Sequence, residues 1–202
     1  MSLNSARPVW KIEQMPTPRV MSDTVILPNG EIRSLSDLVN GMKKGSSGWG
    51  LGKDPNLSPT LYMPSKPLGQ RFKLLAASTI PRVYHAIAIA LPDGKVLIGG
   101  SNTNDGYKYN VEYPTELRIE KFSPPYLDPA LANMRPKIVN TATPKQIRLL
   151  LLGIFEVKKE VGDFHQIQAV APPSGNVAPP AYYLLFAVYN GVPSIGEWIQ
   201  IV

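Results

Sequence analysis

The sequence predicts an all-β chain that contains about two blades of a β-propeller followed by a small β-sandwich. Three observations support this prediction. Two segments of the chain share one strand-and-turn pattern. The composition combines 21 Pro and 16 Gly with 44% hydrophobic residues, which suits short strands and turns better than long helices. Beyond residue 135, short apolar runs alternate with turn residues, as in a sandwich.

The repeated unit consists of "PRVMSDTVILPNGEI" at 18–32 and "PRVYHAIAIALPDGKVLIGG" at 81–100. Each copy has Pro-Arg-Val, an apolar run, Leu-Pro and then Asn-Gly or Asp-Gly, and the spacing from Arg19 to Arg82 is 63 residues. Asn29-Gly30 and Asp93-Gly94 predict hairpins with two-residue type I′ turns, in which both central residues have positive φ. Repetition at about this length is typical of propeller blades.

The segment after the first copy, "SLSDLVNGMKKG" at 34–45, departs from the strand pattern. Its apolar residues fall at helical spacing, and Ser34 with Asp37 forms a weak capping box. We therefore expect a short helix or an irregular insert here, with a helical turn in residues 35–42.

The next segment contains Gly48, Gly50 and Gly52 within "GSSGWGLGKDP". A phosphate-binding loop is one interpretation of these glycines. The Gly-Lys-Ser/Thr sequence and the strand–loop–helix context that such a loop needs are both missing. A tight turn that presents Trp49 is the better interpretation.

The C-terminal part begins with "RPKIVNTATPKQIRLLLLGIFEV", a Pro-bounded passage into a long apolar strand. "FHQIQAVAPPSGNVAPPAYYLLFAVYNGVPSIGEWIQIV" then predicts further strands separated by Pro-rich and Gly-containing turns, with the last turn at Gly191-Val192-Pro193.

Composition excludes several classes of function. The chain has no cysteine, which excludes disulfides and thiolate metal sites. The net charge of +6 comes from scattered basic residues, which favours a solvated surface over affinity for an acidic polymer and argues against nucleic-acid binding. No apolar run is long enough for a membrane span, and "MSLNSARPVWKIEQ" lacks the apolar core of a signal peptide.

The adjacent pair Tyr84-His85 is the main candidate for a functional site. The two residues are either ordinary side chains at the start of a strand or neighbouring ligands of one metal. Successive residues of a regular strand point to opposite faces, so both can reach one metal only if the strand begins irregularly. The regular alternation starts only at Ala86, and the first copy has Met21 and Ser22 at the matching positions, so the hairpin itself does not require the pair.

Six motifs resemble the galactose oxidase and glyoxal oxidase family of copper-radical oxidases, and its plant glyoxal-oxidase-like branch in particular. They are "PVWKIEQMPTPRVMSDTVILPNG", "GWGLGKDPNLSPTLYMPS", "RVYHAIAIALPDGKVLIGGSN", "EYPTELRIEKFSPPYL", "RPKI" and "APPAYYLLFAVYNGVPSIGEWIQI". The resemblance implies the last two blades of a seven-bladed kelch propeller at 5–134, with further blades upstream. It also implies a shortened immunoglobulin-like early-set domain at 135–202.

The resemblance also implies a copper ion on the propeller axis. In the family one tyrosine and the following histidine are ligands, which here correspond to Tyr84 and His85, and both donor types suit Cu(II). A second histidine lies in a C-terminal-domain loop, and a second tyrosine cross-linked to cysteine carries the radical. Here residues 135–148 pass almost directly from Arg-Pro-Lys-Ile to Gln-Ile-Arg, so we expect a few dozen residues with the second histidine to be missing. His165 falls on a strand position where the family has no ligand.

The family oxidises aldehydes or alcohols, for example aldehyde + O2 + H2O to carboxylic acid + H2O2. Because the radical tyrosine, its cysteine and the second histidine are missing, we expect this chain to be inactive alone. Two alternatives are a non-catalytic extracellular module that binds cell-wall polysaccharide and a truncated gene product. The resemblance implies a small aldehyde or alcohol substrate, copper as cofactor and an extracellular or cell-wall location.

Overall fold

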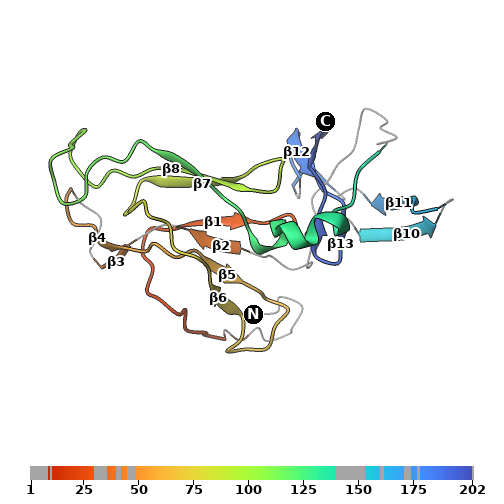
Figure 1. Cartoon of the computed structure of the whole chain (residues 1–202), viewed down its shortest axis with the longest axis horizontal. Helices are drawn as coiled ribbons and strands as arrows, with labels where there is room; N and C mark the ends of the chain where they lie inside the picture. The colour runs from red at the N-terminus through yellow and green to blue at the C-terminus, as the bar shows by residue number, and fades with distance from the viewer. Residues whose placement is uncertain are drawn as a thin grey trace. The chain divides into compact units, whose positions relative to one another are not determined.

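The computed structural model describes residue 9 and residues 11–29, 36–39, 42–44, 49–139, 153–159, 162–170, 174–176 and 178–201. The chain divides into two compact units, one made of Met1–Leu91 with Lys95–Pro124 and the other of Pro92–Gly94 with Pro125–Val202 (Figure 1). The all-β fold class is confirmed, because the only helices among the described residues are two 3₁₀ segments. Among the residues that the structure describes, no helix is long and apolar enough to cross a membrane.

The first unit begins with a four-stranded antiparallel sheet. Its strands lie in the order β1 (Asp23–Ile26), β2 (Ser36–Val39), β5 (Thr60–Tyr62) and β6 (Phe72–Leu74). A separate antiparallel pair, β3 (Met42–Lys44) and β4 (Lys53–Pro55), is inserted between β2 and β5. The sheet is therefore a four-stranded meander of the kind that forms a propeller blade.

The second sheet of this unit contains β7 (Ala86–Ala90), β8 (Val96–Gly100) and β9 (Ile119–Phe122), with β8 in the centre. The first strands of the two sheets, β1 and β7, are in contact. At this contact the Ala88 backbone N–H donates to the Asp23 carboxylate, while burial raises the pKa of that carboxyl group. The apolar core comes from alternate strand positions, mainly Val25, Leu61, Val96 and Ile98.

The second unit contains η1 (Pro125–Leu127), η2 (Pro129–Met134) and three antiparallel pairs. These are β10 (Gly153–Lys159) with β11 (His165–Val170), β12 (Ala181–Leu185) with β15 (Glu197–Ile201), and β13 (Val188–Tyr189) with β14 (Val192–Pro193). A small core forms from Ala178, Ile199 and Ile201, against which Tyr183 and Leu185 pack.

The hairpin tip Pro92–Gly94 belongs to this second unit through polar contacts. The Tyr126 hydroxyl donates to the carbonyl oxygen of Gly94. The Arg135 Nη2 donates to the carbonyl oxygens of Asp93 at 2.6 Å and Ser194 at 3.2 Å.

The helical turn predicted for residues 35–42 is wrong where the structure describes this segment. Ser36–Val39 form β2 and Met42 begins β3, while residues 34, 35, 40 and 41 lie outside the described residues. β2 pairs with β1 on one side and with β5 on the other. Hydrogen bonding to two distant strands outweighs the weak helical preference of the local sequence.

The two-residue turn predicted at Asn29-Gly30 of the first copy falls partly outside the described residues, because Gly30 is not among them. The pairing of β1 with β2 in the described residues ends at Ile26 and Ser36.

In the second copy Gly94 lies at the hairpin turn as predicted, with φ +87°. The loop nevertheless has three residues, 92–94, because Leu91 N donates to Lys95 O at 2.8 Å. Pro92 suits the first position of a type I turn, and a left-handed glycine completes this class of hairpin.

Two further turn predictions can be compared with the structure. Trp49 and Gly50 form a tight turn with Trp49 63% exposed, which confirms the turn interpretation of this loop. The last turn lies at Asn190 and Gly191, with φ 47° and 78°, as a type I′ turn requires. Val192 and Pro193 follow it as strand β14.

Candidate metal centre

Tyr84 and His85 lie immediately before β7, and their side chains lie side by side. The two ring centroids are 4.5 Å apart, with an interplanar angle of 74°. His85 has φ +56°, in the left-handed region, so regular strand alternation begins only at Ala86. The irregular strand start that a shared metal would require is therefore present. A non-glycine residue in that region costs about 1–3 kcal/mol, which the surrounding contacts must offset.

The Tyr84 ring is buried, with an exposed fraction of 3%, whereas His85 is exposed. Tyr84 packs with Val83, and Tyr113 packs against both. Gly52 lies directly behind the ring, since a Cβ added there would be 3.0 Å from two Tyr84 ring carbons. The phenol of the pair is thus held in the core, while the imidazole faces solvent.

Two loops surround the Tyr84 ring and are bonded to each other. The carbonyl oxygen of Thr103 accepts from Gly50 N at 2.5 Å and from the Tyr84 hydroxyl at 3.5 Å. The Thr103 hydroxyl accepts from Gly52 N at 3.3 Å. The Gly-rich loop therefore supports the ring of the candidate ligand, a role that the sequence alone did not reveal.

Within the loop between β8 and β9 lies a network of buried and half-buried polar side chains. The Asn102 Oδ1 accepts from Asn104 N and from the Thr115 hydroxyl, both at 3.1 Å. The Asn104 Nδ2 donates to Tyr113 O at 2.9 Å. Because its members bond one another, this network can make the loop after β8 rigid. Sequence reasoning missed it, although the run "SNTND" at 101–105 carried a signal, since Asn, Asp and Thr favour such turns.

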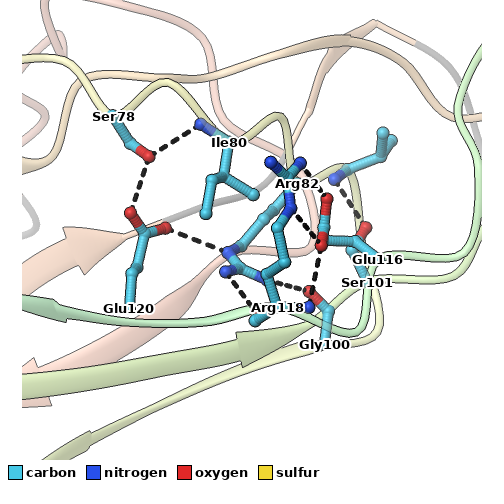
Figure 2. A network of polar contacts seen from close by, with 9 residues as sticks. Ser78, Ile80, Arg82, Gly100, Ser101, Glu116, Arg118 and Glu120 are labelled. Carbon is cyan, nitrogen blue, oxygen red and sulfur yellow. Dashed lines mark hydrogen bonds and ion pairs between the residues drawn. The ribbon is translucent and has the colours of Figure 1, made fainter.

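A bidentate ion pair lies close to the buried Arg82. Arg118 donates to Glu116 through Nε at 2.8 Å and through Nη2 at 2.5 Å (Figure 2). The hydrogen bonds from Arg118 lower the pKa of the Glu116 carboxyl to about 2 from its ordinary value of 4.5, and the charge of Arg82 contributes to this lowering. Glu116 is therefore charged at any physiological pH.

The other histidine, His165, lies in β11 of the second unit. Its side chain is exposed, and its Nδ1 lies 3.2 Å from the carbonyl oxygen of Asp163. Among the described residues, no three or more His, Asp or Glu side chains form a group that could hold a metal ion. The pair Tyr84 and His85 therefore provides one phenol oxygen and one imidazole nitrogen, a donor set that suits Cu(II) but is incomplete by itself.

Comparison with known proteins decides the family. A family model described as glyoxal oxidase N-terminus matches residues 1–126. The chain belongs to the glyoxal oxidase family. A second model, described as galactose oxidase-like early set domain, matches residues 130–201.

Two curated relatives of this family are plant proteins. "Aldehyde oxidase GLOX1" of Arabidopsis thaliana is 66% identical to the chain, with 100% of the chain and 39% of the relative covered. "Aldehyde oxidase GLOX" of Vitis pseudoreticulata is 40% identical, with 98% of the chain and 44% of the relative covered. The chain thus spans about two fifths of the length of these glyoxal oxidase relatives.

A solved structure shares the fold. It is described as a novel fungal alcohol oxidase of the AA5 family in complex with copper. The TM-score is 0.73 at 20% identity, with 96% of this chain and 45% of the other covered.

The alignment with the Arabidopsis relative is also longer than this chain. It extends over 242 positions, whereas this chain has 202 residues, so about 40 positions of the relative have no counterpart here. The size of this difference, though not its place along the chain, matches the few dozen residues that the motif order predicted to be missing.

Proposed function

We propose that this chain contributes two copper ligands, Tyr84 and His85, to a copper-radical aldehyde oxidase and is inactive by itself. The observation that carries the proposal is the left-handed φ of His85, which brings the two rings to 4.5 Å instead of to opposite faces of a strand. The names of the plant relatives, both aldehyde oxidases, support the same activity.

The residues present fit one part of a copper site. A buried phenol fixes one donor in place, and an exposed imidazole beside it is accessible to the metal. When bound, copper supplies one of the two one-electron acceptors that the oxidation of an aldehyde requires. The chain's own residues orient the Tyr84 side chain. Thr103 accepts a hydrogen bond from the Tyr84 hydroxyl, and Gly52, which has no side chain, leaves room for the Tyr84 ring.

The same residues argue against activity of the chain alone. The sequence has no cysteine, so a thioether-linked tyrosine cannot form within it. Its other histidine, His165, begins strand β11, at a position where the family has no ligand. Two donors alone bind a transition metal weakly, because in a complete site the free-energy cost of ordering the ligands is shared among more metal–ligand bonds.

Copper titration followed by EPR tests the ligand assignment. We expect weak Cu(II) binding by the wild-type chain, with loss of the nitrogen signal in His85→Ala and little change in the matched control His165→Gln. Binding that is unchanged in His85→Ala would refute the ligand assignment.

A peroxide assay tests the inactivity of the chain alone. The chain with added copper should produce no H2O2 from glyoxal, methylglyoxal or galactose above a Tyr84→Phe, His85→Ala control. Copper-dependent peroxide above that control would contradict the proposal.

The remaining parts of the proposal follow from the family. They are a small aldehyde or alcohol as substrate, an extracellular or cell-wall location, and a boundary near residue 134 between the last propeller blade and the early-set domain. Binding of cell-wall polysaccharide by a non-catalytic module remains the alternative, and the exposed Trp49, Tyr107 and Tyr109 are the side chains that favour it.

A further inference from the structure

Arg82, two residues before Tyr84, is almost completely buried, with an exposed fraction of 1%. Its guanidinium uses all three nitrogens. The Nε donates to Glu120 Oε1 at 3.1 Å, the Nη2 donates to Arg118 O at 2.9 Å, and the Nη1 donates to Gly100 O (Figure 2). One side chain thus connects the segment before β7 to the end of β8 and to β9.

The Glu120 carboxylate extends this connection toward the preceding segment. Its second oxygen accepts from the Ser78 hydroxyl at 2.8 Å, and that hydroxyl accepts from Ile80 N at 3.0 Å (Figure 2). The backbone from 78 to 82 is therefore attached at two points to one carboxylate of β9.

Beyond Arg82, each residue up to His85 is held against the end of β8. Val83 N donates to the Ser101 hydroxyl at 2.9 Å, and Asn102 N donates to Tyr84 O at 3.0 Å. At Gly100, φ is +75° and an added Cβ would be 3.0 Å from the carbonyl oxygen of His85. We call this set of contacts between Arg82–His85 and Gly100–Asn102 the β8 clamp.

We propose that Arg82, through the β8 clamp, is the positioning residue that holds Tyr84 and His85 with their rings side by side. A non-glycine residue stays in the left-handed region only when its surroundings determine its backbone. If Arg82 released Gly100, His85 would return to extended backbone, and strand alternation would turn the two rings to opposite faces. The importance of this geometry for copper rests on the proposed function, whereas the geometry itself does not.

The chain contains a matched control for this role. Arg19 occupies the equivalent position of the first copy, and its Nη2 donates to Ser58 O and to the Thr60 hydroxyl in β5. In both copies, therefore, the arginine before the first strand of the sheet donates a hydrogen bond to the third strand. In the first copy the left-handed residue is Met21, which corresponds to Tyr84 and not to His85, and no ring pair follows.

Lysine is the informative substitution at both positions. It retains the charge, but it replaces the planar fork of five N–H donors with a single ammonium group. Arg82→Lys can keep an ion pair with Glu120, but it cannot at the same time reach Gly100 O and Arg118 O with the same geometry.

The first measurement needs no copper. The chain has two histidines, so the imidazole C–H signals in an NMR spectrum can be assigned with His165→Gln. In the wild type the adjacent Tyr84 ring should displace the His85 signals, and Tyr84→Leu defines their position without that ring. We expect Arg82→Lys to move the His85 signals most of the way to the Tyr84→Leu position, and Arg19→Lys to leave them unchanged.

Wild-type His85 signals in a folded Arg82→Lys chain would overturn the proposal. If Arg82→Lys does not fold, Ser101→Ala removes only the hydroxyl that accepts from Val83 N. This variant should move the His85 signals in the same direction, and unchanged signals would overturn the proposal equally.

The second measurement is Cu(II) affinity by titration and EPR. Loss of an orienting partner of a metal ligand typically weakens metal binding about 10–100-fold. We expect a decrease of at least about tenfold in Arg82→Lys and none in Arg19→Lys. Affinity unchanged by His85→Ala would refute the proposed function, and the NMR result would still decide the role of Arg82. Affinity that depends on His85 but not on Arg82 would refute the positioning role alone.

Discussion

Gly52 packs against the ring of Tyr84, and a methyl group there should destabilise the chain. An added Cβ would overlap Val83 Cγ1 and would lie 3.0 Å from two carbons of the Tyr84 ring. Val83 and Tyr84 are 2% and 3% exposed, so neither can move into solvent without opening the core. Overpacking of this kind costs about 1–3 kcal/mol of the free energy of unfolding.

The matched control is Gly99→Ala. Gly99 is also buried, but its added Cβ would meet Ile119 Cγ1 at 3.7 Å, an ordinary van der Waals distance. Alanine also restricts the unfolded chain more than glycine does, which is worth about 0.4–1 kcal/mol in favour of folding. Gly99→Ala should therefore be neutral or slightly stabilising.

Urea unfolding followed by circular dichroism measures both variants. With a typical slope of about 2 kcal/mol per molar urea, the midpoint of Gly52→Ala should fall by roughly 0.5–1.5 M. Gly52→Ala should also displace the His85 imidazole signals, because the Tyr84 ring must move. Equal midpoints for the two alanine variants, or a wild-type midpoint for Gly52→Ala, would refute this reasoning.

Two further predictions concern the two units separately. The pKa of Glu116 is lowered to about 2 by Arg118, so its contribution to stability is complete above about pH 4.5 and is lost as the pH falls toward 2. The difference in unfolding free energy between wild type and Glu116→Gln should shrink across this range in acid titrations, and a constant difference would contradict it. In the second unit, Tyr126→Phe removes the buried hydroxyl that donates to Gly94 O and should cost about 1–2 kcal/mol in denaturant unfolding. A near-neutral Tyr126→Phe would show that the Gly94 carbonyl finds another donor.

Local patterns predicted the elements that depend on near neighbours. The alternation from Ala86 to Ala90 produced strand β7, and the hairpin glycine Gly94 adopted the positive φ that its turn requires. The turn at Trp49 and Gly50 followed from composition alone. These features are decided within a few residues of chain, which is the range over which periodicity and turn chemistry act.

The helix predicted for residues 35–42 is wrong because contacts with distant segments decide the structure there. The spacing of Leu35, Leu38 and Met42 is compatible with a helix, but Ser36–Val39 lie between β1 and β5 as the second strand of a sheet. Those partners come from 23–26 and 60–62, and a local window contains neither.

Features of the candidate site can also be separated into those that the local sequence determined and those that distant contacts decided. The sequence alone determined that a tyrosine and a histidine are adjacent at the start of a strand, that the chain has no cysteine, and that the repeat does not demand the pair. Only the tertiary structure decided that His85 takes a left-handed backbone and that its ring lies beside Tyr84. That outcome depends on Gly100, Ser101 and Glu120, which lie 15 to 35 residues further along the chain than His85. The physical reason is that a buried guanidinium and a strained backbone are stable only when distant segments supply their partners.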